Sequence, residues 1–241
     1  MKSRGANRVV EVYICQLPEE KSQSELTSML AYVSGERQKR IMQFFHLADA
    51  YRTLVGELLI KHVLYKQSGK RAKDITIEKN AYGKPYFPDY PSIQFNISHS
   101  GDFVVCAVHD QQVGIDVEEV RVFDLCMAKQ LFTEFEYWEI LAAENKSLVC
   151  FDIWTMKESY VKALGKGLAI PLDSFRVKKI KMDQAVIIDM DRNEEIKGFM
   201  LKQFTIAKDY KLAVCAHGAS EYNFCKYPDQ ISFHHLCNDV M

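Results

Sequence analysis

The sequence predicts a mixed α/β (α+β) protein built from two similar halves. Two long helical patterns, each closed by a glycine, alternate with groups of short strand-like runs. The tripeptide Val105-Cys106-Ala107 recurs as Val214-Cys215-Ala216 near the end of each half, which indicates an internal duplication. No low-complexity linker separates the halves, so we expect them to pack closely. The predicted units are residues 1–112, residues 113–218 and a C-terminal tail at 219–241, which we expect to be loosely docked.

In the first half, a β-branched run at residues 9–14 predicts a strand, and a helical stretch follows from about Ser24. Apolar residues recur at helical spacing between Gly35 and Gly69, which predicts at least one long helix that ends at the second glycine. Further strands are expected at residues 75–78, 93–97 and 103–108, and a tight turn leads from the last of these to a strand at 113–117, which opens the second half.

In the second half, Thr133 and Glu136 have the spacing of a capping box, which predicts a helix over residues 134–144. Another helix should begin near Cys150 and end at Gly165. Strands are then expected at residues 175–181, 185–190, 199–206 and 211–215.

Composition excludes several function classes. The 241 residues carry 31 Lys plus Arg and 32 Asp plus Glu, a net charge of −1, so no overall positive field favours nucleic acid or an anionic membrane. No apolar run approaches the length of a membrane span. The seven cysteines include no CxxC pair and lie mostly in apolar runs, as expected of reduced, buried thiols. We therefore expect a soluble cytoplasmic protein with neither nucleic acid nor membrane as a partner.

The segment Gly114-Ile115-Asp116-Val117-Glu118-Glu119 carries the first candidate chemistry. Alternate residues of a strand share a face, so Asp116 and Glu118 should point the same way, with α-carbons roughly 6.5 Å apart. Ile115 and Val117 would then face the core. Two carboxylates in this arrangement suit one divalent cation, although an acidic strand edge facing solvent explains the same pattern.

The predicted helix from Phe151 to Leu164 carries a second group of candidate functional residues. Glu158 and Lys162 are four residues apart and share a face, whereas Lys157 falls inside the apolar arc. A lysine there must extend to the surface or meet an anion, because burying an unpaired ammonium is costly. A plain surface pair explains Glu158 and Lys162 equally well. The same residues also suit a metal-bound pyrophosphate, which needs cations for its oxygens and a carboxylate for the metal.

Taken together, these segments resemble a known family. Residues 113–118, followed by 154–163 and 165–168, look like the paired signature of Sfp-type 4′-phosphopantetheinyl transferases. Gly83-Lys84-Pro85 and residues 95–100 are similar to two further motifs of the family, and residues 49–54 to its N-terminal one. The resemblance covers about residues 9–217.

The resemblance implies a monomer with the 4′-phosphopantetheinyl transferase fold, in which a pseudo-two-fold axis relates two α/β halves and coenzyme A and Mg²⁺ bind between them. Glu36 departs from the pattern, because related sequences often carry a base there. By match of motif, the metal ligands would be Asp116, Glu118 and Glu158; the pyrophosphate contacts Lys157 and Lys162; the 3′-phosphate contacts Lys39, Arg52, Ser98 and His99; and the adenine border Gly83, Lys84 and Pro85.

The implied reaction transfers the 4′-phosphopantetheine arm of coenzyme A to a serine of an apo acyl, peptidyl or aryl carrier protein, and it releases adenosine 3′,5′-bisphosphate. Lys162 would stabilise the departing oxygen, and Glu158 would accept the serine proton directly or through a metal-bound water. The apolar and basic segment from Val120 to Phe132 would dock the carrier, although burial in the core explains the same apolar residues. Such proteins often serve antibiotic, nonribosomal peptide or polyketide synthesis.

Two other functions compete with this hypothesis. A homologue that binds coenzyme A or a carrier without catalysis would keep the fold, but the presence of all three carboxylates and both helix lysines disfavours it. A metal-dependent nuclease also pairs carboxylates with lysine, but the net charge of −1 provides no basic groove for nucleic acid.

Overall fold

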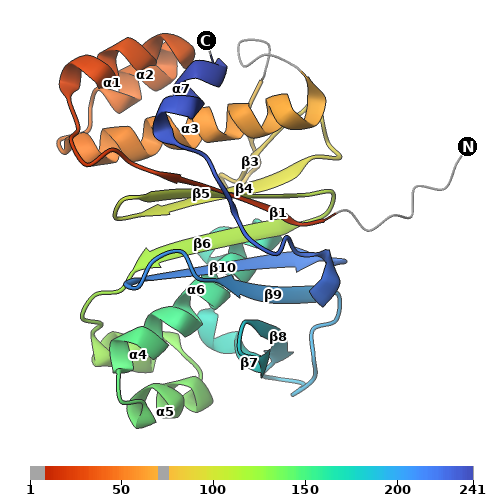
Figure 1. The fold of residues 1–241 in the computed structure, drawn as a ribbon. Helices are drawn as coiled ribbons and strands as arrows, with labels where there is room; N and C mark the ends of the chain where they lie inside the picture. Colours follow the sequence, from red (N-terminus) through yellow and green to blue (C-terminus); the bar gives the residue numbers. More distant parts are fainter. Residues whose placement is uncertain (1–8, 70–75, 241) are drawn as a thin grey trace, which may run out of the picture.

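Four layers make up the protein, in the order helices, sheet, sheet, helices (Figure 1). The computed structural model describes residues 9–69 and 76–240. The predicted α/β class is confirmed. Ile75, the first residue of one predicted strand, lies outside the described residues.

The N-terminal half holds a four-stranded sheet in the order β11-β1-β5-β4. Strands β1, β5 and β4 are antiparallel neighbours, and β11 joins β1 in parallel. Helices α1, α2 and α3 cover its outer face, and β2 and β3 form a separate small hairpin (Figure 1). The bounds are β1 Glu11–Gln16, α1 Gln23–Met29, α2 Gly35–Ile41, α3 Leu47–Ser68, β2 Glu78–Lys79, β3 Pro85–Tyr86, β4 Gln94–Ser100, β5 Phe103–His109, β11 Asp229–Gln230 and a 3₁₀ turn Leu30–Tyr32.

The predicted long helix between Gly35 and Gly69 is divided into α2 and α3. Ser34 caps the first turn of α2, because its side chain accepts from the Arg37 N–H. Helix α3 then runs for 22 residues and ends at Gly69, whose φ of 70° closes the helix in the left-handed conformation.

The C-terminal half holds a five-stranded antiparallel sheet in the order β6-β10-β9-β8-β7. Helix α6 packs on its outer face beside α4 and α5. The predicted capping box at Thr133 and Glu136 is present, and α6 ends at Gly165 as expected. The bounds are β6 Val113–Glu119, α4 Leu125–Leu131, α5 Glu134–Ala142, α6 Lys146–Leu164, β7 Phe175–Lys181, β8 Gln184–Asp189, β9 Phe199–Phe204, β10 Tyr210–His217, α7 Phe233–Val240 and 3₁₀ turns Gly167–Ala169, Leu172–Ser174 and Glu221–Asn223.

The repeated tripeptide lies at matching places in the two sheets. One copy is in β5, between β1 and β4, and the other is in β10, between β6 and β9. Each of these strands contacts the long helix of its own half, α3 or α6. Each half thus has its own sheet and its own long helix, and each of these helices ends at a glycine in the left-handed conformation.

The inner faces of the two sheets share one apolar core, which confirms that the halves pack closely. Val12, Val105 and Ala107 from the N-terminal sheet contact Ile115 and Val214 from the C-terminal sheet there. Because Ile115 and Val117 face this core, Asp116 and Glu118 face α6 on the opposite side of β6, as strand alternation predicts.

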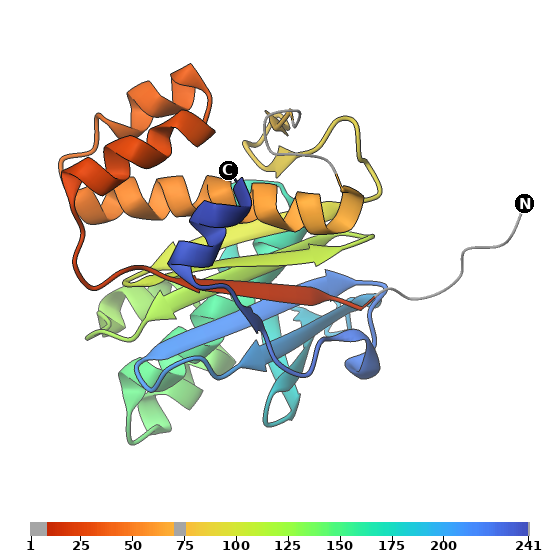
Figure 2. The same ribbon diagram turned by 45° about the horizontal axis from the view of Figure 1, so that its top comes forward.

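The expectation of a loosely docked tail is wrong. The chain after β10 returns to the N-terminal half, where β11 pairs with β1 and α7 lies against α3 (Figure 2). Phe233 and Leu236 are buried in the core around α3, and Ile231 joins them. The tail therefore completes the hydrophobic core of the half in which the chain began.

Two further features bear on the sequence predictions. None of the helices in the described part of the chain has the length and apolar character that a membrane crossing requires. The six cysteines whose side chains are described form no disulfide.

Candidate active site between the two halves

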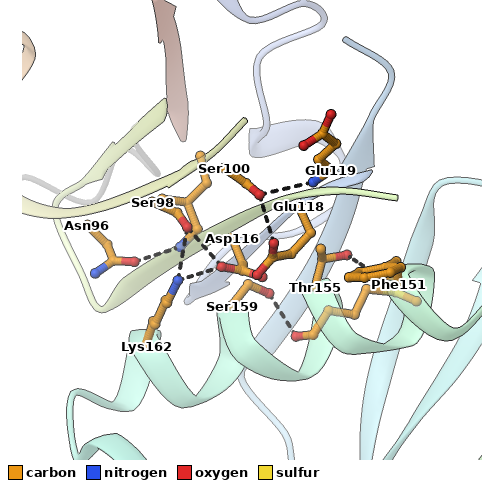
Figure 3. Close-up of polar contacts among 12 residues, drawn as sticks. Asn96, Ser98, Ser100, Asp116, Glu118, Glu119, Phe151, Thr155, Ser159 and Lys162 are labelled. Carbon is orange, nitrogen blue, oxygen red and sulfur yellow. Dashed lines mark hydrogen bonds and ion pairs between the residues drawn. The ribbon is translucent and has the colours of Figure 1, made fainter. Parts of the chain in front are cut away.

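A pocket of about 310 Å³ lies where β4, β6 and α6 meet. Its walls come from both halves of the chain, and six of the predicted site residues contribute to them. The lining residues are Ile97, Ser98, His99, Asp116, Glu118, Trp154, Glu158 and Lys162. Figure 3 shows how β4 and β6 place their polar side chains above α6.

Glycine at position 114 brings α6 this close to β6. A Cβ at this residue would lie 2.0 Å from the Ser159 carbonyl oxygen and 2.3 Å from the Ala163 nitrogen, so only glycine permits the contact. The close approach sets Glu158 and Lys162, which lie on the neighbouring turns of α6, beside the carboxylates of β6.

Asp116 is the most buried acid of the pocket, with 2% of its surface exposed. The Lys162 Nζ lies 2.5 Å from its Oδ1, and the Ser98 hydroxyl donates to the same oxygen at 2.8 Å. Burial raises the pKa of Asp116, although the Lys162 ammonium opposes the shift. Its Oδ2 is buried and has no hydrogen-bond partner among the described residues.

Two further carboxylates share the pocket. Burial and the negative charge of Asp116 raise the pKa of Glu118, and the same two causes raise that of Glu158. We call Asp116, Glu118 and Glu158 the pocket carboxylates. Among the described residues that line the pocket, Lys162 is the lysine that accompanies these three acids.

Oxygen ligands in this arrangement fit a hard divalent cation such as Mg²⁺. The described residues include no set of three His, Cys, Asp or Glu side chains already arranged as a metal site. The Lys162 ammonium pairs with one oxygen of Asp116. The unpartnered Asp116 Oδ2 and the excess of carboxylates nevertheless provide the donors that a cation requires.

Comparison with known proteins identifies the family. A family model described as 4′-phosphopantetheinyl transferase, N-terminal, matches residues 20–111, and that of the 4′-phosphopantetheinyl transferase superfamily matches 112–215. The 4′-phosphopantetheinyl transferase Sfp of Bacillus subtilis is 36% identical over 209 residues, which cover 86% of this chain and 92% of that protein. The chain belongs to the 4′-phosphopantetheinyl transferase superfamily.

Other relatives in the superfamily extend the match. The 4′-phosphopantetheinyl transferase gsp of Aneurinibacillus migulanus is 36% identical over 232 residues, which cover 95% of this chain and 94% of that protein. The 4′-phosphopantetheinyl transferase HetI of Nostoc is 31% identical over 167 residues, covering 66% of this chain and 70% of that protein. The match to gsp extends over more of this chain than the match to Sfp.

Lys157, predicted to contact the pyrophosphate, lies elsewhere in this phosphopantetheinyl transferase. Its side chain is fully buried on the far side of α6, and its Nζ lies 2.9 Å from the Glu136 Oε2. The ammonium also donates to the carbonyl oxygens of Leu172, at 2.8 Å, and Phe175. The prediction is corrected: Lys157 meets an anion within the protein core and does not line the pocket.

Lys84, predicted beside the adenine, also has its ammonium committed to the protein. Its Nζ donates to the carbonyl oxygens of Val113 and Lys162, both at 2.9 Å, and Ala163 at 3.1 Å. Three acceptors match the three N–H groups of an ammonium, and two of them belong to the last turn of α6. Burial lowers the pKa of Lys84 to about 8. Its charged end therefore links the halves, whereas Pro85 on β3 remains partly exposed.

Arg52 and His99 form a basic group at one end of the pocket. The Arg52 guanidinium donates to the Gly101 carbonyl oxygen at 2.7 Å and to the Asp49 carboxylate at 2.6 Å. Partial burial and the positive charge of Arg52 lower the pKa of His99. The structure thus places two of the four predicted 3′-phosphate residues close to one another.

Lys39, predicted at the same phosphate, is exposed on α2. Arg37 and Arg40 of that helix instead line a separate pocket of about 450 Å³, together with Glu57 and Lys61 of α3. Arg37 also pairs with Glu57 at 2.9 Å. Sequence reasoning missed these two arginines, although their spacing of three places them on one helix face.

The predicted docking segment, Val120 to Phe132, has both buried and exposed residues. Phe132 is buried and Phe123 packs near it and near Trp154, with ring centroids 6.2 Å apart in each case. Val122 and Met127 are the segment's large exposed apolar side chains, at 97% and 49%. A partner would therefore meet these two residues rather than the whole predicted groove.

Proposed function

We propose that this chain is a Mg²⁺-dependent enzyme that transfers the 4′-phosphopantetheine arm of coenzyme A to a serine of an apo carrier protein. The observation that carries the proposal is the pocket between the halves, where three carboxylates and Lys162 meet. Membership of the superfamily supports the reaction class, and the raised pKa values of Asp116, Glu118 and Glu158 support a cation requirement.

The pocket carboxylates would hold the metal. Mg²⁺ bound there would neutralise charge on the pyrophosphate of coenzyme A. Lys162, on the same wall, would then contact a phosphate oxygen and stabilise the charge on the departing adenosine bisphosphate. Its hydrogen bonds to Asp116 and Ser98, which also line the pocket, support this role.

Glu158 is the proposed general base for the carrier serine. Burial raises its pKa from the ordinary value of a glutamate, which makes it a stronger base than an exposed glutamate. Glu158→Gln preserves shape but removes the basic oxygen. We expect turnover to fall by about 10²-fold or more. Normal turnover with the metal still bound would remove Glu158 from this role.

The 3′-phosphate of coenzyme A would contact Arg52 and His99, with Lys39 and Ser98 as further proposed contacts. Arg52 is already ordered by Asp49 and Gly101, so little side-chain freedom is lost when a phosphate binds. Pro85 on β3 would border the adenine. Arg52→Gln should therefore weaken binding of coenzyme A more than binding of its dephospho form, which lacks the 3′-phosphate.

The carrier would dock on the exposed part of the segment from Val120 to Phe132. Val122→Glu adds a negative charge to a residue that is 97% exposed, so folding should be unaffected. Since carriers present an acidic helix, we expect the KM for the carrier to rise while the affinity for coenzyme A stays unchanged. An unchanged KM for the carrier would move the docking site elsewhere.

Metal dependence tests the proposed reaction directly. Transfer should stop when the protein is treated with EDTA and return when Mg²⁺ is added. Binding of coenzyme A without transfer to acyl, peptidyl or aryl carriers would favour a catalytically silent homologue instead. The shared core between the sheets further supports a proposed monomer, because the two walls of the pocket belong to one chain.

A further inference from the structure

The two sheets meet at the pocket along their edges, and side chains join them there. Strand β4 is the edge of the N-terminal sheet, and β6 is the edge of the C-terminal sheet. Asn96, Ser98 and Ser100 occupy alternate positions of β4, so all three point toward β6 (Figure 3). Each is buried, with 6% to 8% of its surface exposed.

These side chains satisfy the backbone of an edge strand that has no strand partner on this side. The Ile115 N–H donates to the Asn96 side-chain oxygen at 2.9 Å, and the Glu119 N–H donates to the Ser100 hydroxyl at 3.1 Å. Buried backbone N–H groups need such acceptors. The two contacts therefore hold β6 in a defined register against β4.

The same contact fixes the direction of the Ser100 proton. Its oxygen already accepts from the Glu119 N–H, and its own O–H donates to the Glu118 Oε2 at 2.9 Å. A backbone amide on a paired strand cannot rotate, so it orients the hydroxyl, and the hydroxyl in turn orients the Glu118 carboxylate. Glu118 is thereby directed by a residue from the other half of the protein.

Ser98, two residues earlier on the same face of β4, makes a similar pair of hydrogen bonds. Its hydroxyl accepts from the Lys162 Nζ at 3.0 Å and donates to the Asp116 Oδ1 at 2.8 Å. Asp116 and Glu118 of β6 thus each accept a hydrogen bond from a serine of β4. The donor to Ser98 is a side-chain ammonium, however, whereas the donor to Ser100 is a backbone amide.

We propose that Ser100 is a positioning residue for the metal site, because it holds the Glu118 carboxylate in the orientation that binds the cation. This inference rests on the proposed Mg²⁺-dependent function. Hydrogen bonds to ligating carboxylates orient them and tune their affinity for metal. The N-terminal half then contributes to metal affinity without supplying a metal ligand.

Ser100→Ala removes the hydroxyl. Its effect is measured as the affinity of the protein–coenzyme A complex for Mn²⁺, which electron paramagnetic resonance reports. Loss of such an outer partner should weaken Mn²⁺ binding by about tenfold. Ser100→Thr keeps the hydroxyl on a residue suited to a strand and should restore the affinity. Ser28→Ala, which removes an exposed hydroxyl bonded to the Glu25 carbonyl oxygen, is the matched control.

Binding of coenzyme A to each metal-free variant separates positioning from general damage, and it should not change. If Ser100→Ala does not fold, Ser100→Cys keeps the side-chain size with a weaker donor and should also bind Mn²⁺ less tightly than the wild type. Failure of the wild-type complex to bind Mn²⁺ would refute the proposed metal site itself. Tight Mn²⁺ binding by the wild type and equally by the folded Ala or Cys variant would overturn the role of Ser100 alone.

Discussion

Replacing Lys157 with methionine should destabilise the protein without weakening coenzyme A binding. The ammonium is fully buried, pairs with Glu136 at 2.9 Å and lies 4.4 Å from the centre of the Phe175 ring. Burial lowers the pKa of Lys157, and Glu136 opposes the shift, so the pair is stable only when both charges are present. Lys157→Met leaves the Glu136 carboxylate buried without its counter-charge.

Removing one member of a buried ion pair costs about 3–5 kcal/mol. The backbone donors of Thr133 and Val177 still serve Glu136, at 3.0 and 2.9 Å, so we expect the lower part of this range. For a protein of this size, each kcal/mol lowers the melting temperature by about 2–4 °C, so 3 kcal/mol corresponds to a fall of about 6–12 °C.

Thermal unfolding of Lys157→Met, Glu136→Gln and the double variant provides the assay, with coenzyme A binding measured below the transition. The coupling energy from the double-mutant cycle should be favourable by about 1–3 kcal/mol, because the two side chains are in contact. A Lys157→Met protein with wild-type stability and lost coenzyme A affinity would refute the buried assignment. That result would instead support contact between Lys157 and the pyrophosphate.

Three further predictions concern the pocket and the core. Gly114→Ala should lower both transfer activity and melting temperature, because its Cβ would lie 2.0 Å from the Ser159 carbonyl oxygen. The destabilisation should be about 1–3 kcal/mol. A fully active variant would contradict the close contact. The Leu236 side chain has no exposed surface, so Leu236→Ala should lower the free energy of unfolding in urea by about 2–5 kcal/mol. A negligible change in this free energy would show that the tail is not part of the core. The pocket carboxylates have raised pKa values, so in the metal-free protein their contribution to stability is lost as pH rises through those values. Added Mg²⁺ should therefore raise the melting temperature more at about pH 8 than at about pH 5, and a shift independent of pH would contradict the metal site.

Much of the pocket follows from local geometry. Strand alternation alone predicts that Asp116 and Glu118 share a face, and helical spacing alone predicts that Glu158 and Lys162 do. The pocket brings all four together. The order of the motifs and the recurrence of the tripeptide likewise identify two halves before any contact between them is known.

The role of Lys157 depends on contacts that local geometry does not contain. Its place in an apolar arc indicates burial or an anionic partner, but the partner, Glu136, belongs to another helix and already completes a capping box. A capping pattern gives no sign that the same carboxylate also meets a lysine. The phosphate role came from the motif, and the structure replaces it with a contact in the core.

Ser100 and the tail show the same limit for elements distant in sequence. The predicted strand over residues 93–97 ends before Ser100, whereas β4 extends to it, and the contact of Ser100 with Glu118 requires two sheet edges to meet, which no periodicity encodes. Similarly, the apolar residues of α7 become core only because the chain crosses back to α3. Long-range packing therefore determines what local patterns leave open.

The most direct test of the proposed activity is the intact mass of an apo carrier protein after incubation with this protein, coenzyme A and Mg²⁺, beside an Asp116→Ala control. We expect the carrier to gain the mass of one phosphopantetheine, and we expect the gain to disappear without Mg²⁺ or in the control. No gain on acyl, peptidyl or aryl carriers, despite measurable binding of coenzyme A, would contradict the proposed transfer. An equal gain by Asp116→Ala would contradict the assigned site.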